Sequence, residues 1–391
     1  MRILLVTGEF PPMQGGVGDY TREMARAFAA QGHEAFVLTS VSLADAYRGG
    51  EPESWHVLPI VRNWKWGCWR QVLGAVQEVR PDVVNIQYQA AAYDMRSPAV
   101  NLLPWRLGRA PDMPPTVVTF HDLKPPYLFP KAGPLREWTV RRLARHSDAI
   151  IVTNVEDHVT LRQWRSAGQT LPPDHLIPIG SNIPVVLPQA FERAAWRAAR
   201  GYGEADFVWA YFGFLNESKG GECLFRALAR APADHHLLMI GDRVGSSDPT
   251  NQAYAAFVER LMVELGVTER VQWTGFVPTE QVSAALRSAD IVVLPYRDGI
   301  SFRRGSLHAA LAHGCPIVST TPRVPIVELR EQENVLLVPP SDPEALCQAV
   351  VWLQRHPDLR RQIGNGAREL AQQFAWERIA RRTVEEAFRF S

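Results

Sequence analysis

Short apolar runs alternate along the whole chain with stretches whose apolar residues recur at helical spacing. This alternation is typical of parallel sheets joined by crossover helices, and no other feature of the 391 residues limits the fold as strongly. Between the first two runs, for example, Tyr20, Met24 and Phe28 form one apolar face of a helix that stops at Gly32. We therefore predict an α/β fold built on doubly wound parallel sheets.

Twelve apolar runs predict twelve strands, six in each half of the chain. They are residues 2–6, 35–39, 57–61, 82–87, 116–120 and 149–153, and then 207–213, 236–241, 271–275, 291–295, 316–320 and 335–339. Residues 178–188 carry three prolines and interrupt the pattern, which indicates a connection between two domains. Ligands of such sheets bind beyond the carboxyl ends of the strands.

Composition excludes several classes of function. The net charge of +1 argues against nucleic acid as a partner. The four cysteines have no spacing suited to zinc, so we expect reduced thiols and no metal. The N-terminal apolar run predicts a first strand and not a signal peptide, and no run is long enough to span a membrane. We expect a cytoplasmic protein that is at most peripheral to a membrane.

Two glycine-rich loops follow predicted strands and precede predicted helices. The first contains Gly15 and Gly16, and it is as consistent with a plain turn as with a phosphate cradle, because its spacing is not that of the dinucleotide fingerprint. The second begins at Gly213 and contains Lys219. A lysine in such a loop is a reasonable phosphate ligand, and a solvated lysine is an equal alternative.

His121 and Asp122 directly follow the strand at 116–120, where functional residues of α/β proteins gather. A histidine beside a carboxylate is able to act as a base or as a proton donor to a leaving group. The dipeptide alone favours the simpler interpretation, a histidine that caps a helix.

The turn DGISFRRGSLHAALAHG (298–314) joins the strand at 291–295 to a helix of small residues. A helix N-terminus offers free backbone N–H groups to an anion. Arg303 and Arg304 have the wrong charge for this position. We therefore favour a role in anion binding for the two arginines over a solvated helix start.

An aromatic and basic stretch, VRNWKWGCWR, occupies residues 61–70. Its three tryptophans and three basic residues are suited to the surface of a bilayer or to stacking on a sugar. For one or two of the tryptophans, a place in the core is the favoured interpretation.

Taken together, these stretches resemble family 4 of the retaining glycosyltransferases, which have the GT-B fold. The resemblance covers nearly the whole chain, including FPPMQGGVGDY, TFHD, GFLNESKGG, TGFVPTEQVSAALRSADIVVLP and AALAHGCPIVST. It implies two Rossmann-like domains facing across a cleft, residues 1–182 for the acceptor and 183–374 for the donor. The last helix, at about 375–391, is implied to pack back on the first domain.

The resemblance also implies a site without a metal and a nucleoside-diphosphate sugar as co-substrate. It assigns the catalytic position near the transferred sugar to His121, with Asp122 beside it. It assigns the donor phosphates to Gly15, Gly16, Gly213, Lys219, Arg303, Arg304, Gly305 and Ser306. It assigns the nucleoside to Gly241, Phe276 and Val277. The implied acceptor is a sugar, a lipid-linked molecule or another small molecule.

The chain departs from the family pattern at three positions. Phe214 stands where the family has an arginine, and Ser301 and Ala309 stand where it has two glutamates. One interpretation is an active enzyme in which Arg303 and Arg304 replace the missing arginine. The alternative is a catalytically silent GT-B protein that binds a nucleotide or sugar.

Overall fold

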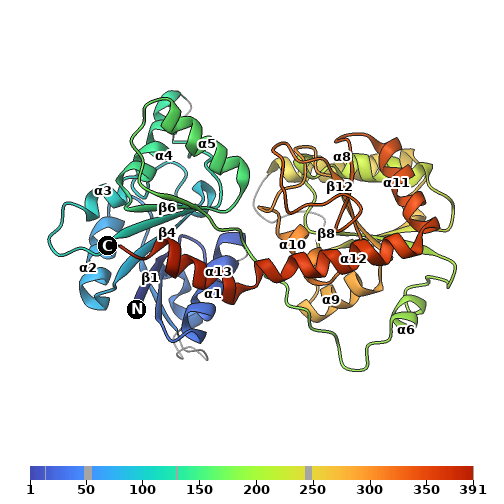
Figure 1. The fold of residues 1–391 in the computed structure, drawn as a ribbon, viewed down its shortest axis with the longest axis horizontal. Coiled ribbons are helices and arrows are strands. Elements are labelled where there is room, and N and C mark those ends of the chain that lie inside the picture. The colour runs from blue at the N-terminus through green and yellow to red at the C-terminus, as the bar shows by residue number, and fades with distance from the viewer. Residues whose placement is uncertain (14, 48–54, 129–130, 243–248, 391) are drawn as a thin grey trace. The chain divides into compact units, whose positions relative to one another are not determined.

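The computed structural model describes residues 1–13, 15–47, 55–128, 131–242 and 249–390. These residues form two compact units (Figure 1). Unit 1 comprises Met1–Asn182 and Phe374–Ser391, and unit 2 comprises Ile183–Gln373. Within the described part of the chain, no helix is long and apolar enough to cross a membrane.

Unit 1 is built on a seven-stranded sheet in which every neighbouring pair is parallel. In spatial order the strands are β3 (His56–Val61), β2 (Glu34–Ser40), β1 (Arg2–Val6), β4 (Val83–Tyr88), β5 (Thr116–Phe120), β6 (Ala149–Val152) and β7 (Asp174–Leu176). The parallel sheet confirms the sequence prediction. The short edge strand β7 was not predicted, because its three residues form no apolar run.

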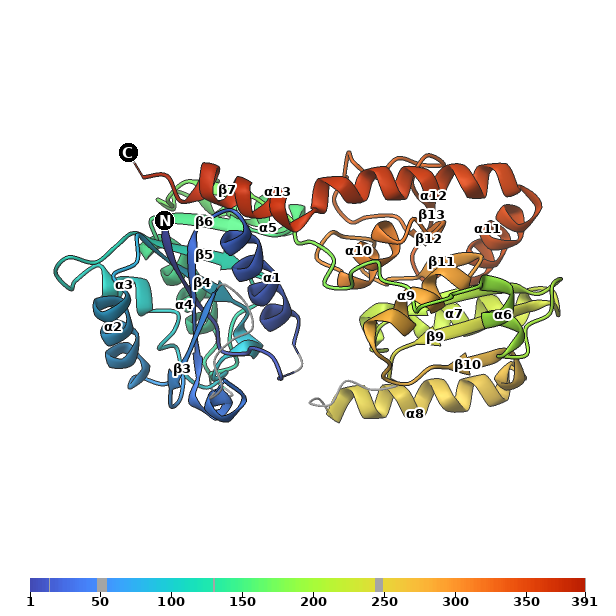
Figure 2. The same cartoon turned by 90° about the horizontal axis from the view of Figure 1, so that it is seen from below.

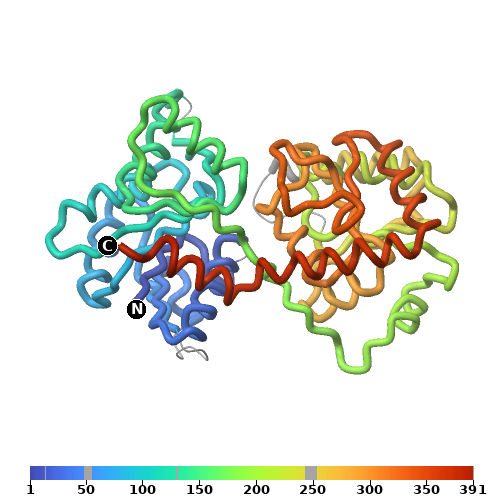
Figure 3. Tube along the Cα trace, viewed as in Figure 1, coloured from blue at the N-terminus to red at the C-terminus, as the bar shows by residue number. Residues whose placement is uncertain are grey.

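Helices cover both faces of this sheet (Figure 2). The helices of unit 1 are α1 (Gly16–Ala30), α2 (Cys68–Val79), α3 (Leu103–Leu107), α4 (Pro134–His146), α5 (Val155–Ser166) and α13 (Trp376–Arg382). One core cluster joins the sheet to α2, α3 and α4, and a second joins it to α1 and α13. The C-terminal segment runs alongside α1 (Figure 3).

Unit 2 repeats the design with six parallel strands. In spatial order they are β10 (Val271–Trp273), β9 (His235–Ile240), β8 (Phe207–Phe212), β11 (Ile291–Leu294), β12 (Ile317–Thr320) and β13 (Leu336–Val338). The helices are α6 (Arg193–Ala198), α7 (Gly221–Arg230), α8 (Pro249–Glu264), α9 (Thr279–Ser288), α10 (Gly305–Ala312), α11 (Pro343–Arg355) and α12 (Pro357–Ala371). Helix α7 packs against α8 and α11, and α10 packs against α12.

Strand order reverses once in each sheet. The first strand of unit 1, β1, lies between β2 and β4, and the first strand of unit 2, β8, lies between β9 and β11. At such a point the loops after neighbouring strands diverge to opposite faces of the sheet, and they leave a crevice beyond the carboxyl ends. A ligand site is therefore expected at the carboxyl edge of each sheet, at the point where the strand order reverses.

Candidate functional site

The loop after β8 carries Lys219 to the carboxyl edge of the sheet in unit 2. Gly213 directly follows the strand and has a φ of 111°, and Gly220 directly precedes α7 and has a φ of 69°. A Cβ atom at Gly220 would stand 2.0 Å from the carbonyl oxygen of Pro295, so the loop fits closely against the segment after β11. The ammonium of Lys219 lies over Gly213, 3.3 Å from where a Cβ of that residue would stand.

The ammonium of Lys219 is in an unfavourable environment. Burial, and then the positive charge of Arg304, lowers the pKa of Lys219 to about 8. Among the described residues, none forms an ion pair or a hydrogen bond with the side chain of Lys219. A desolvated cation beside a second cation is costly unless an anion completes the site.

The basic turn before α10 contains its own counter-ion. Arg304 donates to both carboxylate oxygens of Asp298, at 2.5 and 2.7 Å, and Arg303 also pairs with Asp298. The guanidinium of Arg304 lies 4.9 Å from the ring centre of Tyr296. The side chains of Arg303 and Arg304 are only 27% and 14% exposed, so the turn is not a solvated helix start.

Because Asp298 is shared by two arginines, a net positive charge remains at the carboxyl edge of this sheet. The Nε atoms of Arg303 and Arg304 are buried without a hydrogen-bond partner among the described residues. With Lys219, the cluster has three cationic groups and one anionic group, Asp298. The predicted phosphate residues Lys219 and Arg304 are thus close enough for their charges to interact, as the pKa of Lys219 indicates.

The start of α10 packs into the core beneath the two arginines. Gly305 is the first residue of the helix, and the hydroxyl of Ser306 lies 2.6 Å from the hydroxyl of Tyr296. Burial raises the pKa of Tyr296 to about 12. His308 bonds through Nε2 to the carbonyl oxygen of Phe302 at 2.7 Å, and burial lowers its pKa to about 4. Ser306 and His308 are therefore already engaged with protein groups.

The predicted nucleoside residues lie at the ends of β9 and β10. Gly241 has a φ of 114°, its backbone N–H donates to the hydroxyl of Thr274 at 3.0 Å, and it forms a bridge with Gly275. A Cβ at Gly241 would contact the backbone of Gly213 at 3.8 Å. Phe276 is 72% exposed. The glycines thus bring three strand ends together, with an exposed aromatic ring at one side.

In unit 1, His121 follows β5 and packs against α1 and β4. Its ring makes an edge contact with Tyr20 of α1, with ring centres 4.6 Å apart, and Nε2 lies 3.1 Å from Oε1 of Gln87. Burial lowers the pKa of His121 to about 3. The imidazole is therefore neutral at physiological pH, which does not suit a proton donor to a leaving group.

Asp122 is held by groups other than His121. One carboxylate oxygen accepts from Nε2 of Gln89 at 3.2 Å, and the other accepts from the backbone N–H of Lys124 at 3.2 Å. Among the described residues, no hydrogen bond joins Asp122 to His121. The two adjacent residues do not form an acid–base pair in this structure.

The N-terminus of α1 is already occupied by a carboxylate. Oε1 of Glu9 accepts from the backbone N–H groups of Val17 and Gly18, at 2.8 and 3.2 Å. Burial raises the pKa of Glu9, and these two hydrogen bonds oppose the rise. Of the predicted phosphate residues, Gly15 lies against this carboxylate and Gly16 is the first residue of the helix. Two amides of the helix start, those of Val17 and Gly18, therefore already have an internal partner.

Alanine substitutions at the two glycines are expected to differ. A Cβ at Gly15 would stand 2.2 Å from Glu9 Oε1, whereas nothing lies within 4 Å of a Cβ at Gly16. Gly15→Ala should displace the capping carboxylate and lower the free energy of unfolding by about 1–2 kcal/mol. Gly16→Ala should change it by less than about 0.5 kcal/mol. Urea denaturation of both variants measures this, and equal losses would contradict the role of Glu9.

The aromatic stretch at 61–70 divides between core and surface. Trp64 is buried and donates to the hydroxyl of Ser40 at 2.9 Å. Trp69 is half-buried and donates to the carbonyl of Ala99 at 2.8 Å. Trp66 is 52% exposed and contacts Trp69 edge to face, with ring centres 5.0 Å apart.

Sequence reasoning missed three polar residues of these edges: Glu9, Gln87 and Asn85. Glu9 precedes two prolines and carries no pattern of its own. Asn85 and Gln87 did carry a signal, because they are polar residues at alternate positions of a run that becomes a fully buried strand.

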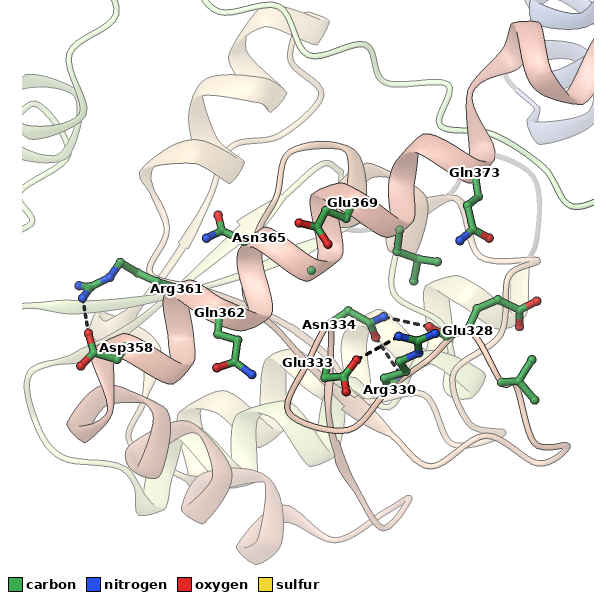
Figure 4. A pocket seen from close by; sticks show the side chains of 13 residues that line it. Glu328, Arg330, Glu333, Asn334, Asp358, Arg361, Gln362, Asn365, Glu369 and Gln373 are labelled. Atoms are coloured by element: carbon green, nitrogen blue, oxygen red, sulfur yellow. Dashed lines mark hydrogen bonds and ion pairs between the residues drawn. The ribbon is translucent and has the colours of Figure 1, made fainter.

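A polar pocket of about 810 Å³ lies elsewhere in unit 2, between α12 and the segment before β13 (Figure 4). Four of its charged groups form two ion pairs, Arg330 with Glu333 at 3.3 Å and Arg361 with Asp358. None of the predicted site residues lines it. We assign no role to this pocket.

Two family models match the chain. Residues 15–179 match the glycosyl transferase 4-like domain, and residues 206–356 match the glycosyl transferases group 1 family. The two matches together cover most of the chain, one in each unit. Each unit thus contains a stretch that is similar to a glycosyltransferase domain family, and the two parallel sheets agree with the GT-B fold.

Individual relatives are more distant. The D-inositol 3-phosphate glycosyltransferase of Saccharomonospora viridis is 27% identical over 242 residues, 61% of this chain and 54% of the relative. The enzyme of the same name from Corynebacterium diphtheriae is 25% identical over 409 residues, 97% of this chain and 92% of the relative. The crystal structure of HepE from Anabaena in complex with UDP has a TM-score of 0.77 at 18% identity and covers 98% of this chain and 99% of that one.

The extent of these alignments varies. This chain spans about half the length of the first curated relatives that it matches. The structural similarity, at less than 25% identity, establishes the GT-B fold.

Proposed function

We propose that this protein transfers a sugar from a nucleoside-diphosphate sugar to an acceptor, with retention of the anomeric configuration and without a metal ion. The observation that carries the proposal is the desolvated ammonium of Lys219 beside Arg304, with no anionic partner of its own among the described residues. A diphosphate supplies the missing negative charge.

The comparisons support the class of donor. HepE from Anabaena, which is similar to this chain in fold, has one crystal structure in complex with UDP and another in complex with UDP-glucose. Several relatives are named as glycosyltransferases of D-inositol 3-phosphate. We propose a sugar, a lipid-linked molecule or another small molecule as the acceptor.

The charges of the chain's own residues make a metal ion unnecessary in this proposal. Lys219 and Arg304 balance the diphosphate, and backbone N–H groups at the starts of α7 and α10 add partial positive charge. In same-face attack the departing phosphate oxygen takes the proton of the acceptor. His121 then positions a sugar hydroxyl and does not act as the general base, which agrees with a pKa lowered to about 3.

A panel of UDP-, GDP- and ADP-sugars tests the proposal directly. Incubation without acceptor, followed by chromatography, is expected to show slow release of one nucleoside diphosphate. The rate should be unchanged by EDTA and should be lost in His121→Ala. Release that requires a divalent cation would refute the metal-independent mechanism.

A silent protein that binds a nucleotide or sugar without turnover is the second candidate. It is favoured by the absence of a carboxylate at Ser301 and Ala309, both buried, and by the engagement of Asp298 with Arg303 and Arg304. Binding of a nucleoside diphosphate without release from any sugar nucleotide, with or without acceptors, would select this candidate.

The affinity for a nucleoside diphosphate should depend on pH through Lys219. Its pKa of about 8 means that the free site loses the ammonium above pH 8, while a bound diphosphate favours the charged form. The affinity should therefore fall about twofold between pH 7 and pH 8, where half of the free lysine is deprotonated, and then by up to about tenfold per pH unit. Isothermal titration calorimetry with UDP from pH 7 to 10 measures this, and a flat profile would exclude the ammonium as a ligand.

A peripheral contact with a membrane is a further part of the proposal. The exposed Trp66 is flanked by Lys65, which is 64% exposed, and by the exposed Arg70. Vesicles of anionic phospholipid are expected to sediment the protein at low salt, and Trp66→Ala should reduce the bound fraction several-fold. Equal sedimentation with neutral vesicles would contradict a contribution of the basic residues to membrane binding.

A further inference from the structure

A row of buried polar side chains connects the core of unit 1 to His121. Asn85 and Gln87 project from β4, and Thr119 projects from β5. Asn85 is paired with Val117 and Gln87 with Thr119 in the register of the two strands. All of these side chains are almost completely inaccessible to solvent, so each polar atom needs a partner within the protein.

A backbone carbonyl fixes the direction of this row. The side-chain amide of Asn85 donates from Nδ2 to the carbonyl oxygen of Val117 at 3.3 Å and to the hydroxyl of Thr119 at 3.0 Å. The carbonyl oxygen of Val117 is only an acceptor, whereas a hydroxyl is both a donor and an acceptor. A flipped amide would put two acceptors together, so Oδ1 of Asn85 points to Gln87.

The orientation of Asn85 determines the orientation of Gln87. Nε2 of Gln87 donates to Oδ1 of Asn85, which leaves Oε1 of Gln87 as the atom that faces His121. Oε1 is an acceptor, so Nε2 of His121 has to carry a hydrogen. In the neutral ring, Nδ1 is then the unprotonated nitrogen.

The remaining surroundings keep the ring neutral. From α1 it is contacted by Tyr20, whose phenol is uncharged because burial raises its pKa, and from β4 by the neutral Gln87. Asp122, next along the chain, is engaged by Gln89 and Lys124. Nδ1 has no hydrogen-bond partner among the described residues and is not one of the fully buried unsatisfied atoms.

We infer that Asn85 and Gln87 are positioning residues that lock His121 in the Nε2–H tautomer, so that Nδ1 presents a hydrogen-bond acceptor to a ligand hydroxyl. This inference rests on the proposed function only for the identity of that hydroxyl, which belongs to a sugar. A ligand group without an O–H or N–H donor is not recognised by this nitrogen, which makes the row a determinant of specificity.

The tautomer is measurable in the full chain by long-range ¹H–¹⁵N correlation spectroscopy of protein labelled at its eleven histidines. The His121→Asn variant identifies the signals of His121. We expect a protonated Nε2 and an unprotonated Nδ1 from pH 5 to pH 8. An Nδ1–H tautomer, or an imidazolium in this range, would overturn the inference whether or not a nucleotide binds.

Two variants separate positioning from a merely structural role. Gln87→Glu puts a carboxylate against Nε2–H, which should raise the pKa of His121 and make Nδ1 a donor at low pH. Thr119→Val removes a hydroxyl from the row but leaves the bond to Val117, so the tautomer should persist. If Gln87→Glu leaves the His121 signals unchanged, Gln87 does not control the ring.

Hydrolysis of UDP-glucose gives the functional outcome. In Gln87→Glu the rate should fall at least tenfold below the raised pKa of His121 and recover above it, whereas wild type should show no such step. An equal loss of the hydrolysis rate at every pH would overturn the assignment of Gln87 as a positioning residue for His121. If UDP-glucose is not hydrolysed by wild type, its addition should still shift the Nδ1 signal, and an unshifted signal would remove the sugar hydroxyl as the partner.

Discussion

Lys219→Ala is expected to weaken the binding of UDP, GDP or ADP about 10- to 100-fold. A hydrogen bond to a charged group contributes about 1.5–3 kcal/mol, and this ammonium is desolvated and has no internal counter-ion among the described residues. The variant should fold with unchanged or higher stability, because removal of an uncompensated buried charge relieves a cost. Calorimetry at pH 7, together with urea denaturation, measures both quantities.

Lys65→Ala is the matched control for total charge. Lys65 is 64% exposed, belongs to unit 1 and lies 3.8 Å from Asp94. Its removal should leave nucleotide affinity within about twofold, since exposed ion pairs contribute little. Equal affinities for wild type and Lys219→Ala would mean that the lysine is a structural feature of the loop and would remove the main support for the phosphate site.

The fold could be predicted because its determinants are local and repeated. A buried parallel strand needs a continuous apolar run, and twelve such runs are visible in the sequence. The strand β7 (Asp174–Leu176) was not predicted, because this edge strand of three residues buries too little surface to require an apolar run. The parallel pairing of neighbouring strands was also predictable, since crossover helices make parallel neighbours.

The candidate site could be predicted only in part, because its chemistry depends on contacts between distant residues. Lys219 and His121 were identified because each of them lies in a segment that follows a predicted strand. The capping of α1 by Glu9 depends on how a turn folds back, and the sequence contains no capping pattern that predicts it. The neutral state of His121 depends on Gln87, 34 residues away, and on burial.

The basic turn illustrates the same limit. From the sequence, Arg303 and Arg304 were unfavourable at a helix start and therefore suggested an external anion. In the structure Asp298 offsets part of that charge, and what remains unbalanced is the ammonium of Lys219 together with one surplus arginine charge. An external anion is therefore still expected, because the cluster of Lys219, Arg303, Arg304 and Asp298 as a whole has a net positive charge.

Asp298→Ala is expected to lower the free energy of unfolding of the free protein by about 2–4 kcal/mol. Removing one partner of a buried ion pair leaves the other charge uncompensated, at about 3–5 kcal/mol when burial is complete. A quarter of the Asp298 side chain is exposed, which reduces the loss. Saturating UDP should recover part of it, because Arg303 and Arg304 are then free to bind the diphosphate, and ligand binding to the folded state raises stability.

Asp290 offers a matched control within the same unit. It also pairs with two arginines, Arg193 at 2.7 Å and Arg197 at 3.0 Å, but it precedes β11 at the opposite edge of the sheet. Asp290→Ala should destabilise the protein at least as much, since only 12% of its side chain is exposed, and UDP should recover none of the difference. Thermal unfolding with and without UDP compares the two variants. If UDP narrows the gap to wild type equally for both, the turn at Arg303 and Arg304 is not part of the nucleotide site.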